Sequence, residues 1–307
     1  MRFFEPPEIK NQQVLLPELQ NSGVEIFIKR EDQIHPYISG NKYRKLKYNL
    51  LDASAKKYST LLSFGGAFSN HIAAVAQAGE SYGFDTIGII RGEELKDKIS
   101  VNPTLAFAKS KGMKLVFVSR EEYRQKSEKF FIDNLADKFG SFYLLLEGGT
   151  NALAVKGCEE ILQAGDRNFT HVAVCVGTGG TISGLINASC ENMQILGFPA
   201  LKGDFLTREI CKFATKENWC IIPDYTFGGY AKIDGSLIDF MNRFYAKTGI
   251  PLDPVYTGKM MYGILDLVKM GYFKKGTSIL AIHTGGLQGI EGMNQRLKEK
   301  NLPLIHL

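Results

Sequence analysis

Long hydrophobic runs and paired cysteines are both missing from this sequence. No apolar run approaches the roughly 20 residues of a membrane-spanning helix, and the first residues lack the apolar core of a signal peptide. The five cysteines are odd in number, and no two of them form a Cys-x-x-Cys pair. Because the histidines are scattered as well, we expect neither a disulfide framework nor a metal site. These absences predict a cytoplasmic protein with reduced thiols and no membrane segment.

Strong charge of one sign is also absent. The 37 lysines and arginines stand against 32 acidic residues, which gives a net charge of +5 over 307 residues. The basic residues are spread along the chain, and this distribution argues against a nucleic-acid-binding surface. The small positive excess favours weak attraction of anionic ligands. With 44% hydrophobic residues, the chain has the composition of a globular protein that is long enough for two domains.

Short apolar runs alternate with segments of helical periodicity. Helices are expected at 70–82, 104–111, 121–138 and 153–164, and strands at 24–28, 60–64, 86–90, 114–118, 142–145, 171–176, 194–197 and 278–282. Such alternation predicts an α/β fold with mainly parallel sheets flanked by helices. Turns from a strand into the next helix then lie at the carboxyl edge of a sheet, where ligands bind.

Lys42 stands where electrostatics disfavours a cation. Asn41 or Ser39 is expected to cap a helix whose apolar positions follow at Tyr43 and Leu46. Lys42 then lies in the first turn, where the helix dipole opposes a positive charge by roughly 0.3–1 kcal/mol. The same field lowers the pKa of an amine and raises its nucleophilic fraction. Lys42 is therefore either a solvated surface lysine or the reactive amine of an active site.

A glycine-rich turn follows the strand expected at 171–176. It reads Gly177-Thr178-Gly179-Gly180-Thr181-Ile182-Ser183-Gly184. Backbone N–H groups of such a turn, at the start of a helix, bind a phosphate. A dinucleotide is disfavoured because Ile182 replaces the third glycine of its fingerprint and no acidic residue ends the next strand. The turn thus predicts a site for one phosphate, with a plain strand-to-helix turn as the alternative.

Five segments, in this order, resemble one group of enzymes that depend on pyridoxal 5'-phosphate (PLP). They are residues 40–46, Ser69-Asn70-His71, the glycine-rich turn, Val255-Tyr256-Thr257-Gly258-Lys259 and His283-Thr284-Gly285-Gly286. The group comprises the 1-aminocyclopropane-1-carboxylate (ACC) deaminases and the D-cysteine desulfhydrases, and the resemblance covers nearly the whole chain. It implies the two-domain, tryptophan-synthase β-like PLP fold (fold type II), with parallel-rich sheets flanked by helices. Residues 1–44 and 152–307 would form the large PLP-binding domain, and 45–151 a small inserted α/β domain.

The resemblance also implies roles for individual residues. PLP would be held by Lys42, Asn70, Gly177, Thr178, Gly179, Gly180, Thr181 and Thr257, with Lys42 at its aldehyde, Asn70 at its ring hydroxyl and Thr257 at its pyridine nitrogen. Catalysis would use Lys42, Ser69, Tyr230 and Tyr256. The substrate would be bound by Ser69, Asn70, His71 and Thr284. The alternative role of Ser69 and Asn70 is to cap a helix, and the alternative for His71 is a packed structural role. Lys45 is expected to be scaffold.

Two positions bear on the substrate. The ACC deaminases carry Glu and Leu where this chain has Thr257 and Thr284, and both threonines resemble the D-cysteine desulfhydrases. The expected activity is β-elimination from a small D-amino acid, foremost D-cysteine, which yields pyruvate, ammonia and sulfide. ACC deamination is the first alternative; a nucleotide-binding oxidoreductase and a non-catalytic PLP-binding protein are further ones. A homodimer is expected from the resemblance.

Overall fold

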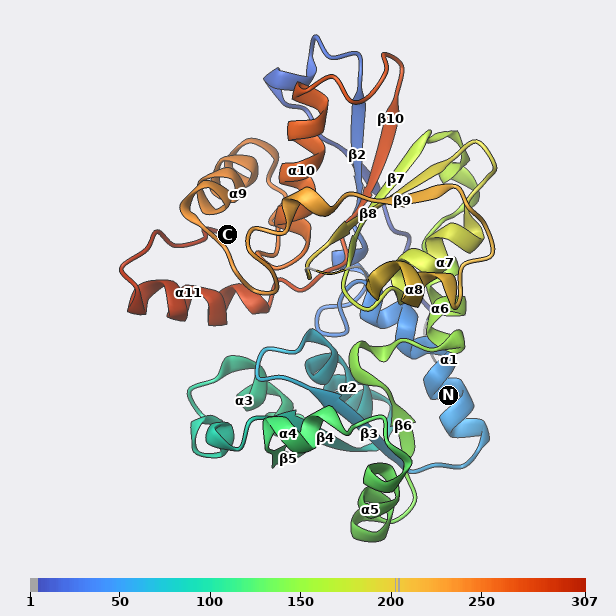
Figure 1. Cartoon of the computed structure of the whole chain (residues 1–307), viewed down its shortest axis with the longest axis vertical. Coiled ribbons are helices and arrows are strands. Elements are labelled where there is room, and N and C mark those ends of the chain that lie inside the picture. Colours follow the sequence, from blue (N-terminus) through green and yellow to red (C-terminus); the bar gives the residue numbers. More distant parts are fainter. Residues whose placement is uncertain (1–4, 202, 204) are drawn as a thin grey trace.

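The computed structural model describes residues 5–201, 203 and 205–307 of the chain. Within them, the strands form two sheets that lie one above the other in Figure 1. The larger sheet has the order β1-β2-β10-β7-β8-β9, with strands Asn11–Gln13, Glu25–Lys29, Ser278–Ile282, His171–Val176, Gln194–Pro199 and Trp219–Ile221. The smaller sheet has the order β5-β4-β3-β6, with strands Lys114–Val118, Asp85–Arg91, Thr60–Gly65 and Tyr143–Leu145.

All pairings in the two sheets are parallel except that of β1 with β2. The eight strands predicted from apolar runs are confirmed, with ends that differ by at most two residues. In β7, for example, Val172 to Val176 are all buried, so both faces of the strand are covered, whereas β5 and β6 are only partly buried. The edge strands β1 and β9, each three residues long, were not predicted.

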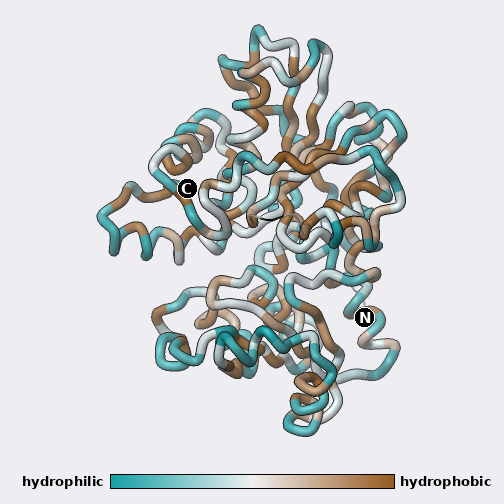
Figure 2. Tube along the Cα trace, in the orientation of Figure 1, coloured by the Kyte–Doolittle hydropathy of each residue, from teal (hydrophilic) through white to brown (hydrophobic). Residues whose placement is uncertain are grey.

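Helices cover both faces of each sheet, so the mixed α/β fold with parallel-rich sheets is confirmed (Figure 1). Figure 2 shows hydrophobic residues concentrated along the strands and hydrophilic ones along the outer turns. The α-helices are α1 Asn41–Ala55, α2 Asn70–Tyr82, α3 Pro103–Ser110, α4 Arg120–Arg124, α5 Lys129–Phe139, α6 Ala152–Glu159, α7 Gly180–Ala188, α8 Phe205–Cys211, α9 Gly235–Thr248, α10 Thr257–Lys269 and α11 Gly289–Glu299. No helix of the described residues is long and apolar enough to cross a membrane.

Two predicted helices were wrong in their extent. The helix expected at 153–164 ends at Glu159, the last residue of α6. The segment 121–138 forms two helices, α4 and α5, instead of one. A capping box starts α4, in which Ser119 and Glu122 each bind the other's backbone N–H. The chain then turns at Gln125, whose carbonyl accepts a hydrogen bond from Glu128 N at 2.8 Å. The residues of this turn are polar, so no apolar contact there would stabilise a continuous helix.

The first long helix, α1, connects the two sheets. It packs closely on α6, where a Cβ added to Gly157 would lie 1.9 Å from the carbonyl oxygen of Arg44. The smaller sheet is built entirely from residues 60–145, whereas the larger sheet takes strands from before and after that range. The domain limits at 44/45 and 151/152 stay a prediction, and α1 crosses the first of them.

Candidate active site

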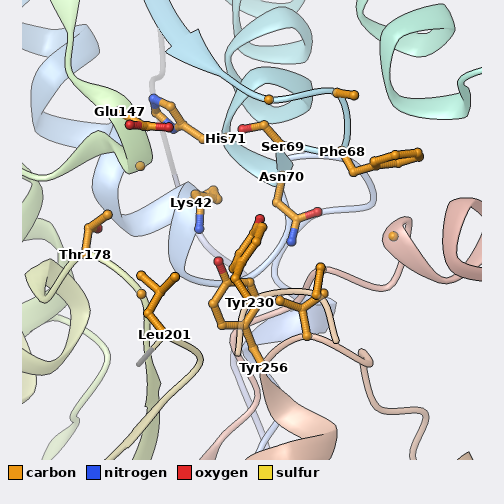
Figure 3. A pocket seen from close by; sticks show the side chains of 18 of the residues that line it. Lys42, Phe68, Ser69, Asn70, His71, Glu147, Thr178, Leu201, Tyr230 and Tyr256 are labelled. Carbon is orange, nitrogen blue, oxygen red and sulfur yellow. The ribbon is translucent and has the colours of Figure 1, made fainter. Parts of the chain in front are cut away.

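A cleft of about 1040 Å³ opens between the carboxyl edges of the two sheets. It is lined by Lys42 at the start of α1, residues 69–71 at the start of α2, the glycine-rich turn before α7, and the rings of Tyr230 and Tyr256. In Figure 3 the amine of Lys42 points into this space, between Thr178 and the two tyrosines. Segments far apart in the sequence thus meet at one place.

Lys42 is placed by an unusual helix start. The residue before α1 is Gly40, at φ 61°, so the caps expected at Asn41 or Ser39 were wrong. A Cβ on Gly40 would lie 1.9 Å from the carbonyl oxygen of Thr284, so only glycine allows this approach. In turn Asn41 N donates a hydrogen bond to Thr284 O at 3.3 Å. This contact joins the start of α1 to the segment that follows β10.

The amine of Lys42 is prepared for nucleophilic chemistry. Its Nζ donates to Asn41 Oδ1 at 3.0 Å, and no ion pair of Lys42 with a carboxylate occurs among the described residues. Burial lowers the pKa of Lys42, an effect that nearby Cys175, Cys158 and Asp253 oppose. A larger neutral fraction makes the amine a better nucleophile.

Lys45, one turn further along α1, also belongs to the site, which the sequence analysis missed. It is 3% exposed, and its Nζ donates to Gly148 O at 3.0 Å and to Thr150 Oγ1 at 3.1 Å. Burial, followed by the charge of Lys42, lowers the pKa of Lys45 to about 7. A Cβ on Gly180 would lie 3.3 Å from Lys45 Nζ, so the amine is packed against the glycine-rich turn.

The glycine-rich turn forms a positive cradle. Gly179 caps α7 in the left-handed region at φ 85°, which leaves the first N–H groups of that helix without a side-chain cap. Asn41 Nδ2 donates to Thr181 Oγ1 at 2.8 Å, and the hydroxyls of Thr150 and Thr178 lie 2.6 Å apart. Free helix N–H groups, hydroxyls and the nearby Lys45 together suit a phosphate.

The start of α2 brings Ser69, Asn70 and His71 to the opposite wall. Ser69 Oγ caps the helix and accepts a hydrogen bond from Ile72 N at 3.2 Å, so the alternative role considered for Ser69 is present. Asn70 Oδ1 accepts from Gln288 Nε2 at 2.9 Å. His71 is 2% exposed, and neither of its ring nitrogens has a hydrogen-bond partner among the described residues. Burial and the charges of the two lysines lower the pKa of His71 to about 3, so the ring is neutral.

Tyr230 and Tyr256 face each other across the lower side of the cleft (Figure 3). Their ring centroids are 6.2 Å apart and the planes meet at 68°. Burial raises the pKa of both phenols, most strongly that of Tyr256. Both hydroxyls therefore carry their protons at neutral pH and can donate them.

Thr257 and Thr284 differ in their access to the cleft. Thr284 lines it, and its hydroxyl lies 2.9 Å from Cys175 Sγ. Thr257 is fully buried and is not part of the lining; its hydroxyl donates to Asp253 Oδ1 at 3.0 Å and accepts from Asp253 N at 2.8 Å. Asp253, which the sequence analysis missed, lines the cleft in front of Thr257. Its carboxylate also accepts from the N–H of Tyr256, and an Asp shortly before a helix was the available signal.

A phosphorylated aromatic aldehyde fits this arrangement. The cradle at α7 suits its phosphate, Lys42 suits its carbonyl carbon, and the unpartnered nitrogens of His71 require a polar group in the cleft. The described residues hold no group of three or more His, Cys, Asp or Glu side chains that could bind a metal ion.

Comparisons with known proteins agree with this fit. Residues 6–285 match the model of the "Pyridoxal-phosphate dependent enzyme" family. A Pyrococcus furiosus protein, provisionally named an ACC deaminase, is 31% identical over 87% of this chain and 86% of its own length. The "Bifunctional D-cysteine desulfhydrase/1-aminocyclopropane-1-carboxylate deaminase, mitochondrial" of Arabidopsis thaliana is 29% identical over 90% of this chain and 75% of its own length.

A solved structure supports the same relationship. It is titled an ACC deaminase homologue, and it superposes with a TM-score of 0.80 at 28% identity over 96% of this chain and 94% of that one. An O-ureido-L-serine synthase, at 18% identity and a TM-score of 0.65, shares the fold alone. The family match over most of the chain, together with the cradle and the amine of Lys42 in the cleft, identifies this protein as a member of the pyridoxal-phosphate dependent enzymes.

Proposed function

We propose that this enzyme catalyses β-elimination from a small D-amino acid, foremost D-cysteine, and releases pyruvate, ammonia and sulfide. The observation that carries the proposal is the placement of the Lys42 amine. It lies between an anion cradle and a wall that offers Ser69 and two protonated tyrosines. Such a site can hold a cofactor on one side and place a small substrate against proton donors on the other.

The cofactor supplies electron withdrawal from the bonds at Cα of the substrate when it is bound. Lys42 would bind its carbonyl carbon, and the amine, once displaced by the substrate, would take the Cα proton. The N–H groups at the start of α7 and the ammonium of Lys45 would bind the phosphate. Asn70 would reach the ring hydroxyl. The role of Thr257 at the pyridine nitrogen stays a prediction, because Thr257 does not line the cleft and its hydroxyl binds Asp253.

The residues at the start of α2 would bind the substrate. Ser69, Asn70 and His71 stand at the positive end of a 13-residue helix, which favours the α-carboxylate of an amino acid. Tyr230 and Tyr256 would donate a proton to the leaving sulfur, because both phenols line the cleft and are protonated at neutral pH. Thr284 would border the substrate from the larger sheet.

ACC deamination is the second candidate, and the names of the relatives favour it. Ring opening of ACC breaks a carbon–carbon bond without a good leaving group, whereas elimination from D-cysteine expels sulfide. In this chain position 257 carries a neutral threonine instead of a glutamate, which resembles the desulfhydrase side of the family. We also propose that the protein is a homodimer and is located in the cytoplasm. The proposal includes neither nucleic acid nor a membrane as a partner.

The test combines a spectrum with three substrates. The purified protein should be yellow, and borohydride should fix the cofactor on a peptide that contains Lys42. Sulfide and keto-acid assays should give a specific rate on D-cysteine at least about tenfold above that on ACC, or ~1.4 kcal/mol of barrier, and above that on L-cysteine. An ACC rate equal to the D-cysteine rate would overturn the substrate assignment, and protein without a PLP absorption band after incubation with PLP would overturn the role of Lys42.

A further inference from the structure

Lys259 has no role in the proposed function, although it lies in the same segment as Tyr256. It stands in the first turn of α10 and is 2% exposed. Both burial and the helix dipole oppose a cation at this position. Burial lowers the pKa of Lys259 to about 8, and no carboxylate forms an ion pair with it among the described residues. A lysine in so unfavourable a place must be held there by specific contacts.

Those contacts are two backbone carbonyls of one loop. Lys259 Nζ donates to Thr226 O and to Gly229 O, each at 2.8 Å. The same carbonyls close two successive turns, because Gly229 N donates to Thr226 O at 3.0 Å and Lys232 N to Gly229 O at 3.2 Å. The residue that directly follows Gly229 is Tyr230. One buried ammonium therefore joins both turns that present this tyrosine.

The loop has a strained backbone. Four of the five residues 227–231 lie in the left-handed region, with φ 50° at Phe227, 86° at Gly228, 117° at Gly229 and 54° at Ala231. Phe227 and Ala231 are not glycines, and such residues rarely adopt positive φ unless the surroundings enforce it. The conformation thus needs support from outside the loop.

One face of α10 gives this support. Tyr256, Lys259 and Tyr262 follow each other at intervals of three residues, which places them on the same side of the helix. The rings of Tyr262 and Phe227 pack edge-on with their centroids 5.0 Å apart. The ring centroids of Tyr256 and Tyr230 are 6.2 Å apart. Lys259 lies between these two ring contacts and supplies the hydrogen bonds.

We propose that Lys259 is a positioning residue, which holds the loop 226–231 so that the hydroxyl of Tyr230 stays in the cleft beside Tyr256. The side chain of Tyr230 is 47% exposed, so packing alone does not fix it and its place depends on the backbone beneath it. The inference rests on the catalytic role proposed for Tyr230. It adds the residue that sets the geometry of that tyrosine.

The first test needs no catalysis. In protein freed of PLP, Lys259→Met should raise the hydrogen-exchange rates of the Gly229 and Lys232 amides by about tenfold or more, because both donate within the turns that Lys259 joins. Lys269→Met, an exposed position in the last turn of the same helix, should leave those rates unchanged. Equal exchange in all three proteins would overturn the proposal. If Lys259→Met does not fold, Lys259→Gln, which is neutral and shorter, serves in its place.

The second test is a double-mutant cycle on the enzyme with PLP bound. Tyr230→Phe should lower kcat by about 100-fold, as expected for loss of a proton donor. Lys259→Met should lower kcat by about tenfold in the wild-type background, and by less than about twofold in the Tyr230→Phe background. An equal loss in both backgrounds would mean that Lys259 only supports the fold, which overturns the inference. Wild-type kinetics of Tyr230→Phe would instead refute the proposed role of Tyr230, and the exchange rates would still decide whether Lys259 holds the loop.

Discussion

At the scale of single residues, the cleft is notable for polar groups that burial keeps neutral. His71 has no hydrogen-bond partner for either nitrogen among the described residues and lies near Lys42 and Lys45, whose charges oppose its protonation. Unsatisfied buried nitrogens cost about 1–3 kcal/mol of folding free energy each. A polar ligand that binds these nitrogens would offset this cost.

His71 should make the protein sensitive to acid. Its pKa is about 3 in the folded protein and about 6.5 in the unfolded chain, so the unfolded state binds more protons between these values. The stability that His71 contributes is fully present above pH 6.5 and is lost progressively as the pH falls toward 3. Urea unfolding of the PLP-free protein at pH 7 and pH 4.5 measures this loss.

The matched variants for this measurement are His71→Gln and His306→Gln. Glutamine does not titrate, so His71→Gln should lose less stability than the wild type between the two pH values. His306 is exposed, and His306→Gln should behave like the wild type. If all three proteins lose stability equally, other groups cause the acid sensitivity.

At the scale of elements, the start of α7 decides where an anion can bind. Gly179 adopts a left-handed turn directly before the uncapped N–H groups of α7, and it lies next to Ile210. A Cβ added there would lie 3.4 Å from Ile210 Cγ1, an approach that the neighbour can accommodate by a small shift. The positive φ of 85° means that any side chain at this position adds some backbone strain.

Two substitutions at this position separate charge from strain. Gly179→Ala and Gly179→Asp add the same Cβ, and Asp tolerates a positive φ at least as well as Ala, but only Asp adds a negative charge next to the expected phosphate. Gly179→Asp should therefore bind PLP at least about tenfold more weakly than Gly179→Ala, since like charges repel in a partly desolvated site. Absorbance titration with PLP gives both dissociation constants, and equal values would place the phosphate elsewhere.

At the scale of the whole molecule, the cleft is held by contacts between the two sheets' own helices. Gln288, just before α11, donates to Asn70 Oδ1 at 2.9 Å, and Phe68 packs so closely on α11 that a Cβ on Gly292 would lie 2.6 Å from its ring. These contacts join the start of α2 to the C-terminal helix. Burial also lowers the pKa of Lys45 in the cleft and of Lys259 in α10, and the effect of both on the stability of the molecule should be measurable.

The free energy of unfolding of the PLP-free protein should reach its maximum near pH 10. Burial lowers the pKa of Lys45 to about 7 and that of Lys259 to about 8, against 10.5 for an ordinary lysine. The unfolded chain then binds more protons in this range, so the free energy of unfolding rises from about pH 7 to about pH 10. Above pH 10 it falls again, because burial raises the pKa of Tyr43 and Tyr225 to about 12.

Urea midpoints between pH 6.5 and 11 measure this curve. Lys45→Met should flatten its rising part, while Lys96→Met, at an exposed position, should leave it unchanged. A curve that falls steadily from pH 7 would contradict the prediction.

Much of the fold and part of the site followed from local sequence. Eight strands could be predicted because each contains consecutive apolar residues, and in β7, β8 and β10 these residues are buried on both faces of the strand. Lys42 and the glycine-rich turn could be singled out because helix starts and glycine turns have local chemical signatures. PLP dependence followed from the resemblance of five such segments, and the family match confirms it.

Contacts between distant segments decided the rest. Nothing in the sequence showed that Lys45, Lys259 and Asp253 are buried. The loop at Gly148 packs on Lys45, the loop 226–231 on Lys259, and the start of α10 on Asp253. The strands β1 and β9 exist because a neighbouring strand completes their hydrogen bonds. The pKa of a buried lysine depends on desolvation by residues far along the chain, and an edge strand depends on pairing with a neighbouring strand. The tertiary structure alone determines these contacts.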